Sequence, residues 1–206
     1  MTCIGRAHGS RSLILNKLSI EFRTVAALLL TTLAFAASDA QARKTGAART
    51  QPIDMVVIHS TGGPICDAVT GKPIWVSAGT LDDNLRHIEA HPVLGIHYMI
   101  DRDGTLRGSV PEAQVAHHVY SFSKRSIAIE LINDGDGRDP FPEAQLASMV
   151  TLLRDIRKRH AIPRAGIKRH SDLDTAPLPC DKTQRRKVDP GGAFSYEAVL
   201  DRVFAP

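Results

Sequence analysis

The segment MVVIH (residues 55–59) is a run of apolar, mostly β-branched residues that ends at a histidine. This composition predicts a short buried strand over residues 55–58, and the following HSTGG (59–63) predicts a flexible turn at its end. A second apolar segment, SIAIELI (126–132), predicts another strand with alternate isoleucines on one face. We therefore expect a sheet at the centre of the fold, with polar residues where its strands end.

Helical and extended segments alternate along the rest of the chain. Apolar residues spaced three and four apart predict three helices, at residues 81–90, 143–160 and 195–204. An Asp-Gly step between 97–101 and 105–110 predicts a hairpin, 166–170 predicts a short strand, and residues 64–80 are expected to form a loop. These elements predict the α/β class: a single domain with a central mixed β-sheet and flanking helices.

The composition is that of an ordinary globular protein, with 43% apolar and 23% charged residues among 206. The formal net charge of +4 is too small and too scattered to indicate a nucleic-acid partner. The aromatic content of 5% also argues against a surface that stacks on bases. Three cysteines are too few for a multi-cysteine zinc cage.

The first 42 residues have the three-part pattern of a secretory signal peptide. Basic residues precede an apolar stretch at 25–37, and the small-x-small sequence AQA (40–42) follows it. The pattern predicts a signal peptide at 1–42, a linker at 43–52, and a periplasmic or secreted domain at 53–206 with no integral membrane span. An uncleaved anchor is the alternative, although the stretch is shorter than the ~20 residues that a spanning helix needs.

Two cysteines, Cys66 and Cys180, lie in the expected mature chain. An even pair in an oxidising compartment makes a disulfide possible. The sequence does not set the distance between them, so it does not decide whether the two cysteines are bonded.

Several residues that could bind a metal follow the predicted strands. His59 follows the first strand, His170 follows the last, and Asp189 lies in a KVDPG segment. Each of them alone is more often structural, and Asp-Pro-Gly is usually a plain turn. Together, two imidazoles and a carboxylate form a complete three-ligand set for catalytic zinc, with a fourth position open to water.

Glu130 interrupts an otherwise apolar strand, on the face that it shares with Ala128 and Ile132. A charged carboxylate on such a face is costly unless it has a cation, hydrogen bonds or a raised pKa. A raised pKa suits a general base near neutrality. A solvent-exposed edge position is the alternative interpretation.

Five stretches share an order with one known family: VIHST (57–61), HYMIDRDG (97–104), AHH (116–118), SIAIEL (126–131), and HSD (170–172) with KVDPG (187–191). Together they resemble the zinc-dependent N-acetylmuramoyl-L-alanine amidases of the peptidoglycan-recognition-protein fold, the amidase type 2 family. The resemblance covers residues 55–204. It implies hydrolysis of the amide bond between N-acetylmuramic acid and L-alanine, with peptidoglycan or a muropeptide as substrate.

The resemblance also implies roles for individual residues. It implies that Zn²⁺ is held by His59, His170 and Asp189. Glu130 matches the catalytic glutamate, and Lys187 matches the lysine that stabilises the oxyanion. His118 matches a histidine placed beside the substrate, whereas we interpret His97 as structural.

One feature leaves the identity of the third metal ligand open. The stretch 174–186 looks like an insertion and carries Cys180, which is the rival of Asp189 because some branches of the family use a cysteine as third ligand. The pattern Lys-x-Asp-Pro-Gly favours Asp189.

Two other functions also remain as alternatives. One is a non-catalytic peptidoglycan receptor on the same fold, which typically lacks a metal ligand. The other is a zinc amidase that acts on another peptide amide.

Overall fold

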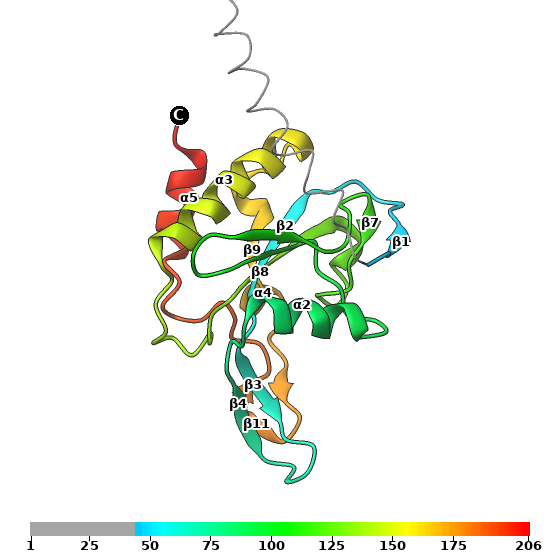
Figure 1. The fold of residues 1–206 in the computed structure, drawn as a ribbon, viewed down its shortest axis with the longest axis vertical. Helices are drawn as coiled ribbons and strands as arrows, with labels where there is room; N and C mark the ends of the chain where they lie inside the picture. The colour runs from blue at the N-terminus through cyan, green and yellow to red at the C-terminus, as the bar shows by residue number, and fades with distance from the viewer. Residues whose placement is uncertain (1–43) are drawn as a thin grey trace, which may run out of the picture. The chain divides into compact units, whose positions relative to one another are not determined.

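A five-stranded mixed sheet organises residues 44–206, the part of the chain that the computed structural model describes (Figure 1). Its strands are β2 (Met55–Ser60), β5 (Tyr98–Ile100), β6 (Leu106–Gly108), β8 (Ser126–Leu131) and β9 (Ile167–Arg169). They lie in the order β6-β5-β8-β2-β9. The last four strands of this order are parallel, and β6 is antiparallel to β5, so the expectation of a mixed sheet is confirmed.

The helices form where the apolar spacing predicts them: α2 (Leu81–Ala90), α3 (Glu143–His160) and α5 (Tyr196–Phe204). Short helical turns occupy α4 (His170–Leu173), η2 (Ser123–Arg125) and η3 (Arg164–Gly166). The start of α2 is set by Thr80, whose hydroxyl accepts a hydrogen bond from the backbone N–H of Asp83 at 3.2 Å. The first residue of α3 follows Pro142, which lacks the N–H that a helix start leaves unpaired.

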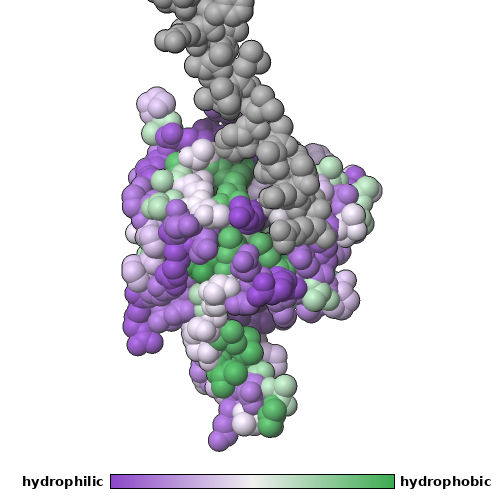
Figure 2. Space-filling model, viewed as in Figure 1, coloured by the Kyte–Doolittle hydropathy of each residue, from purple (hydrophilic) through white to green (hydrophobic). Residues whose placement is uncertain are grey.

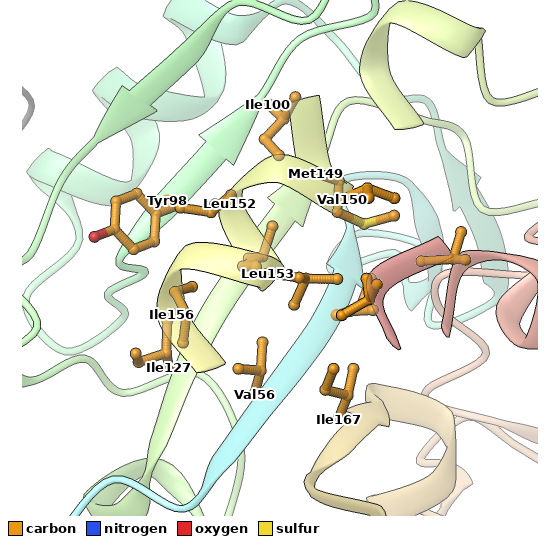
Figure 3. Close-up of a cluster of buried hydrophobic side chains, with 14 of the residues drawn as sticks. Val56, Tyr98, Ile100, Ile127, Met149, Val150, Leu152, Leu153, Ile156 and Ile167 are labelled. Carbon is orange, nitrogen blue, oxygen red and sulfur yellow. The ribbon is translucent and has the colours of Figure 1, made fainter. Parts of the chain in front are cut away.

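Helices cover the two faces of the sheet unequally. α3 and α5 pack on one face, and the cluster in Figure 3 shows apolar residues of α3 against strand residues. Ile58, Ile127 and Ile129 lie in this cluster with 0% exposure. The opposite face carries a smaller apolar cluster that α2 makes with β5 and β8. Because side chains alternate along a strand, His59 and Glu130 belong to this second face.

Residues 64–80 are not a loop, so that prediction is wrong. β3 (Gly63–Cys66) and β4 (Pro73–Val76) form an antiparallel hairpin, and the insertion at 174–186 forms another, with β10 (Pro177–Leu178) and β11 (Asp181–Arg185). Their strands are so short, and so closely flanked by Gly and Pro, that the turn signals outweigh the strand signals in the sequence.

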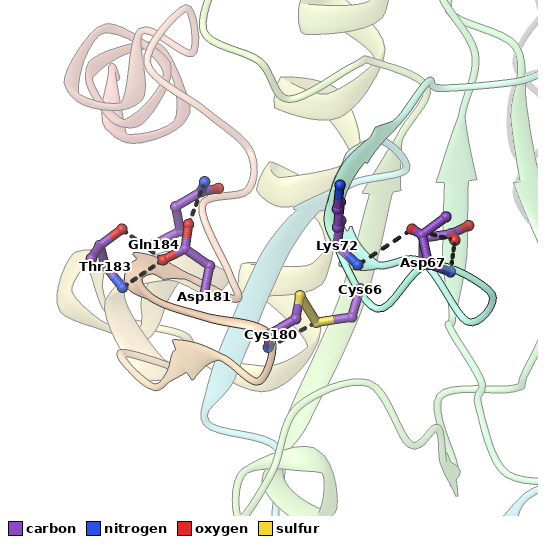
Figure 4. Close-up of a disulfide and its surroundings, with 8 residues drawn as sticks. Cys66, Asp67, Lys72, Cys180, Asp181, Thr183 and Gln184 are labelled. Atoms are coloured by element: carbon purple, nitrogen blue, oxygen red, sulfur yellow. Dashed lines mark hydrogen bonds between the residues drawn. A yellow bond between two sulfur atoms is a disulfide. The ribbon is translucent and has the colours of Figure 1, made fainter.

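The two hairpins form a single projection, the hairpin arm, at the bottom of Figure 1. A disulfide between Cys66 and Cys180 joins them, with the two Cα atoms 5.8 Å apart (Figure 4). The indole N–H of Trp75 donates to the carbonyl oxygen of Asp134 at 2.8 Å and ties the arm to the body. Apolar surface is exposed on the arm (Figure 2), from Ile65, Ile74, Trp75 and Val76.

The segment expected to be a linker packs on the domain. β1 (Ala47–Ala48) pairs with β7 (Gln114–Val115), and the guanidinium of Arg49 donates to several backbone carbonyls. The linker prediction is therefore corrected for these residues: an extended chain can satisfy its backbone on an open strand edge even where its composition is polar. The predicted signal peptide at 1–42 lies outside the described residues.

None of the helices within residues 44–206 combines the length and the apolar character needed to cross a lipid bilayer.

Candidate metal centre and its cleft

Three buried side chains from distant parts of the chain meet at the carboxyl end of the central strands. His59 lies near the end of β2, His170 directly follows β9, and Asp189 lies in the loop before α5. One ligand atom from each lies within 4.8 Å of the other two. The Oδ2 atom of Asp189 is 3.2 Å from Nδ1 of His59 and 2.9 Å from Nδ1 of His170. Because β2 and β9 are parallel neighbours with Ile58 opposite Arg169, the next residue of each chain segment, His59 and His170, lies beside the other.

The electrostatics of this group suit a cation. Burial lowers the pKa of His59 to about 4, against the raising effect of its hydrogen bond with Asp189. Burial also raises the pKa of the Asp189 carboxyl, but hydrogen bonds with His170 and His59 outweigh it and hold that pKa well below its ordinary value. At neutral pH, His59 is therefore neutral and Asp189 ionised, as metal ligands must be.

The loop that carries Asp189 is fixed by close backbone packing. The carbonyl oxygen of Asp189 accepts a hydrogen bond from the N–H of Ser171 at 3.0 Å, and its peptide bond to Pro190 is cis. Gly191 has a φ of +92°, and a Cβ there would lie 2.5 Å from the carbonyl oxygen of Gly135. Only glycine fits this turn without displacing the backbone of the neighbouring loop.

The donor set fits zinc. Two imidazole nitrogens and one carboxylate oxygen are the ligands that catalytic zinc takes from a protein, and the fourth position is left to water. The alternative third ligand, Cys180, is bonded to Cys66 and is not among the converging groups. The structure therefore brings together His59, His170 and Asp189, the set that the sequence favours.

Glu130 lies beside this group. It is the register partner of His59, since β8 and β2 pair in parallel. Burial, and then the nearby Asp189 carboxylate, raise the pKa of Glu130 to about 8, although Lys187 acts to lower it. Within residues 44–206 its carboxylate has no hydrogen-bond or ion-pair partner. The alternative of a solvent-exposed edge is wrong, because β8 lies between β2 and β5.

These groups line a cavity of about 390 Å³ that opens to solvent. Its walls come from α2, from the hairpin arm and from the segment before Asp189. Lys187 lies in that last wall. Ile65 and Val76 of the arm form an apolar wall, which the sequence-based expectation of a loop at 64–80 does not include. The β-branched and aromatic run at 74–76 is the signal that could have found it.

Two histidines at or near the cavity, His97 and His118, are hydrogen-bonded within the protein. His97 is fully buried, and its Nδ1 accepts a hydrogen bond from the backbone N–H of Ala128 at 2.9 Å, which supports its structural interpretation. His118 lines the cavity, but its Nδ1 lies 2.9 Å from Nε2 of His59 and its Nε2 lies 3.0 Å from Oγ of Ser126. His117 is exposed at the cavity wall.

A mixed α/β domain that holds a buried His-His-Asp group beside a carboxylate of raised pKa has the arrangement of a metal-dependent hydrolase. Residues 49–192 match the sequence model of one family, described as N-acetylmuramoyl-L-alanine amidase. The chain belongs to this family of enzymes, which hydrolyse the amide bond between N-acetylmuramic acid and L-alanine in peptidoglycan.

Individual relatives agree with this assignment. The 1,6-anhydro-N-acetylmuramyl-L-alanine amidase AmpD of Haemophilus influenzae is 29% identical over 165 residues, covering 74% of this chain and 84% of that protein. The amidase AmiD of E. coli, solved with anhydro-N-acetylmuramic acid-L-Ala-D-γ-Glu-L-Lys, has a TM-score of 0.57 at 22% identity, covering 75% of this chain and 60% of that one. The amidase LysC of Clostridium intestinale has a TM-score of 0.52 at 19% identity, covering 78% and 97%. The two structural likenesses support the fold.

Proposed function

We propose that this protein is a zinc-dependent amidase that releases stem peptides from N-acetylmuramic acid. The observation that carries the proposal is the buried group of His59, His170 and Asp189, with Glu130 directly beside it on the next strand. A receptor on this fold needs neither a complete ligand set nor an unpartnered carboxylate at the cavity floor. The complete set therefore favours an enzyme.

The side chains divide the chemistry among them. Zinc, when bound to the three ligands, polarises the scissile carbonyl and lowers the pKa of water. Glu130 takes a proton from the attacking water and returns it to the amine of the leaving L-alanine. The ammonium group of Lys187 stabilises negative charge on the carbonyl oxygen, and such a donor is often worth about 3 kcal/mol.

The substrate class that we propose is peptidoglycan or the muropeptides released from it. The names of the H. influenzae relative and of the E. coli complex both specify anhydro-muramyl compounds, which supports soluble muropeptides as one form of the substrate. The cavity is open to solvent, so a peptide and a sugar can extend from it on either side of the cleaved bond.

We further propose that the enzyme acts outside the cytoplasm, in the periplasm or after secretion. The basic, apolar and small-residue pattern of residues 1–42 supports this location. The disulfide between Cys66 and Cys180 supports it independently, since such bonds persist mainly in oxidising compartments.

The test is to incubate the zinc-loaded protein with purified peptidoglycan and to identify the products by mass spectrometry. We expect free stem peptides with an N-terminal L-alanine, lost on chelation and restored by zinc. The matched variant Glu130→Gln should lower the rate by roughly 10²–10⁴-fold with its zinc content unchanged. Binding without release would indicate a receptor. Hydrolysis of another peptide amide, with peptidoglycan left intact, would indicate a different substrate.

A further inference from the structure

We propose that His118 is a positioning residue for the metal ligand His59 and does not bind the substrate through its ring nitrogens. The inference rests on the proposed metal centre. It changes the role that the family resemblance implies for His118. It also adds Ser126 as the residue that orients His118 in turn.

The two ring nitrogens of His59 face opposite ways, one toward the metal position and one away from it. The Nδ1 atoms of His59 and His170 both point at the same oxygen of Asp189, at 3.2 and 2.9 Å. These nitrogens converge on Asp189, so Nδ1 would be the ligand atom of each ring. The Nε2 atom of His59 points away, toward Nδ1 of His118 at 2.9 Å. The two rings meet edge to face, at 83° with their centroids 5.1 Å apart.

Metal binding through Nδ1 of His59 determines where the ring hydrogens of His59 and His118 lie. A neutral imidazole whose Nδ1 lone pair binds a metal carries its single hydrogen on Nε2. That hydrogen is donated to Nδ1 of His118, so His118 must carry its own hydrogen on Nε2. The Nε2–H of His118 then donates to Oγ of Ser126 at 3.0 Å. The hydroxyl of Ser126 donates onward to the carbonyl oxygen of Phe122 at 2.8 Å. Each donor in this series of hydrogen bonds, from His59 to Phe122, therefore has one acceptor.

Further hydrogen bonds to the backbone hold the residues of this hydrogen-bond series in place. The backbone N–H groups of His118 and Val119 both donate to Oγ of Ser123 at 3.1 Å. The Arg49 guanidinium donates to the carbonyl oxygen of Ser126 at 2.7 Å, which holds the first residue of β8 in contact with Nε2 of His118. Both ring nitrogens of His118 are thus engaged by the protein, and only its carbon edges remain for the cavity.

Ligand histidines commonly donate their outer N–H to a partner that fixes the tautomer and orientation of the ring, and loss of that partner typically weakens metal binding 10–100-fold. His118 occupies this place behind His59. Its neighbour His117 offers a matched control, because it lies on the same loop and lines the same cavity but is exposed and is not one of the converging ligand residues.

The experiment measures zinc affinity by competition with a chelating dye, on full-length variants whose folding is checked by circular dichroism. We expect His118→Phe to weaken zinc binding by roughly 10–100-fold. His118→Asn places an amide oxygen near the position of Nδ1 and should restore affinity to within about threefold of wild type. His117→Phe should leave zinc affinity unchanged. An unchanged affinity in His118→Phe, with a raised KM for a muropeptide, would overturn the proposal.

A second measurement needs no substitution at the site. In the zinc-loaded wild-type protein labelled with ¹⁵N-histidine, NMR should show His118 protonated on Nε2 and bare on Nδ1. The opposite tautomer would overturn the proposal even if His118→Phe does not fold. A wild-type protein that binds no zinc at all would overturn the metal centre as well. The two failures are therefore distinguishable.

Discussion

The two faces of the central sheet are made by the same strands but differ in what they bury. On the face under α3 and α5, strands β2 and β8 contribute Val56, Ile58, Ile127, Ile129 and Leu131, all fully buried and apolar. On the face under α2, the same two strands contribute His59 and Glu130, each one residue along from an isoleucine. We name these the core face and the site face.

The difference shows how one strand can serve stability and chemistry together. Each isoleucine on the core face contributes about 1.5–3 kcal/mol by burial. A half-buried carboxylate with no hydrogen-bond partner among the described residues, such as Glu130, costs free energy instead. The two sets of residues alternate, so the core face holds in place the backbone from which the site face projects. Substitutions on the two faces should therefore have separable effects.

The largest effect is expected at Asp189. Asp189→Ala should weaken zinc binding by roughly 10³-fold or more, because the ~10–16 kcal/mol of a zinc site is divided among only a few ligands. The unfolding of the metal-free variant should remain cooperative, since the core face is untouched. Zinc titration and a denaturant melt check both points.

The control for this variant is Cys180→Ser, which removes the disulfide but no group of the metal centre. It should keep zinc affinity close to that of wild type. The reverse pattern, with zinc lost in Cys180→Ser and kept in Asp189→Ala, would make the cysteine the third ligand.

The converse substitution is Ile129→Ala on the core face. This residue is fully buried in the cluster under α3 and lies next to Glu130 in the sequence. We expect a loss of about 2–5 kcal/mol in the free energy of unfolding, because the substitution leaves a cavity. The kcat of the protein that remains folded should stay close to wild type. A large fall in kcat without loss of stability would show that the two faces are not independent.

The smallest expected effect concerns the pH dependence of the site face. The pKa of Glu130 is about 8 in the folded protein, against an ordinary 4.5, so the folded state holds a proton that the unfolded state has lost between these pH values. Stability therefore falls as pH rises through this window, and Glu130→Gln, which cannot ionise, should escape that loss. In metal-free protein we expect the variant to gain about 1–3 kcal/mol over wild type between pH 5 and pH 8.

Denaturant melts of the two proteins across that range give the comparison, since other titrating groups contribute to both. A difference that stays constant with pH would mean that Glu130 has an ordinary pKa and is well solvated.

Local sequence patterns predict much of the fold. The helix α3 has the predicted bounds of residues 143–160, and the alternation of SIAIEL places Glu130 on the face opposite its neighbouring isoleucines, as the structure confirms. The hairpin arm and the docked segment with β1 are missed. Their strands have only two to five residues, and they are stabilised by a disulfide and by contacts with distant loops rather than by local propensity.

For the site, the residue types and their order along the chain determined the candidate ligands, the candidate base and the family. Only the tertiary structure decided that His59, His170 and Asp189 meet, that Cys180 pairs with Cys66, and that the ring of His118 faces His59. The physical reason is the separation in sequence between the residues that make these contacts. Helix and strand preferences depend on residues within a few positions of one another, whereas these contacts join residues between 19 and 130 positions apart. Their distances follow from the pairing of β2 with β8 and β9, which no local pattern specifies.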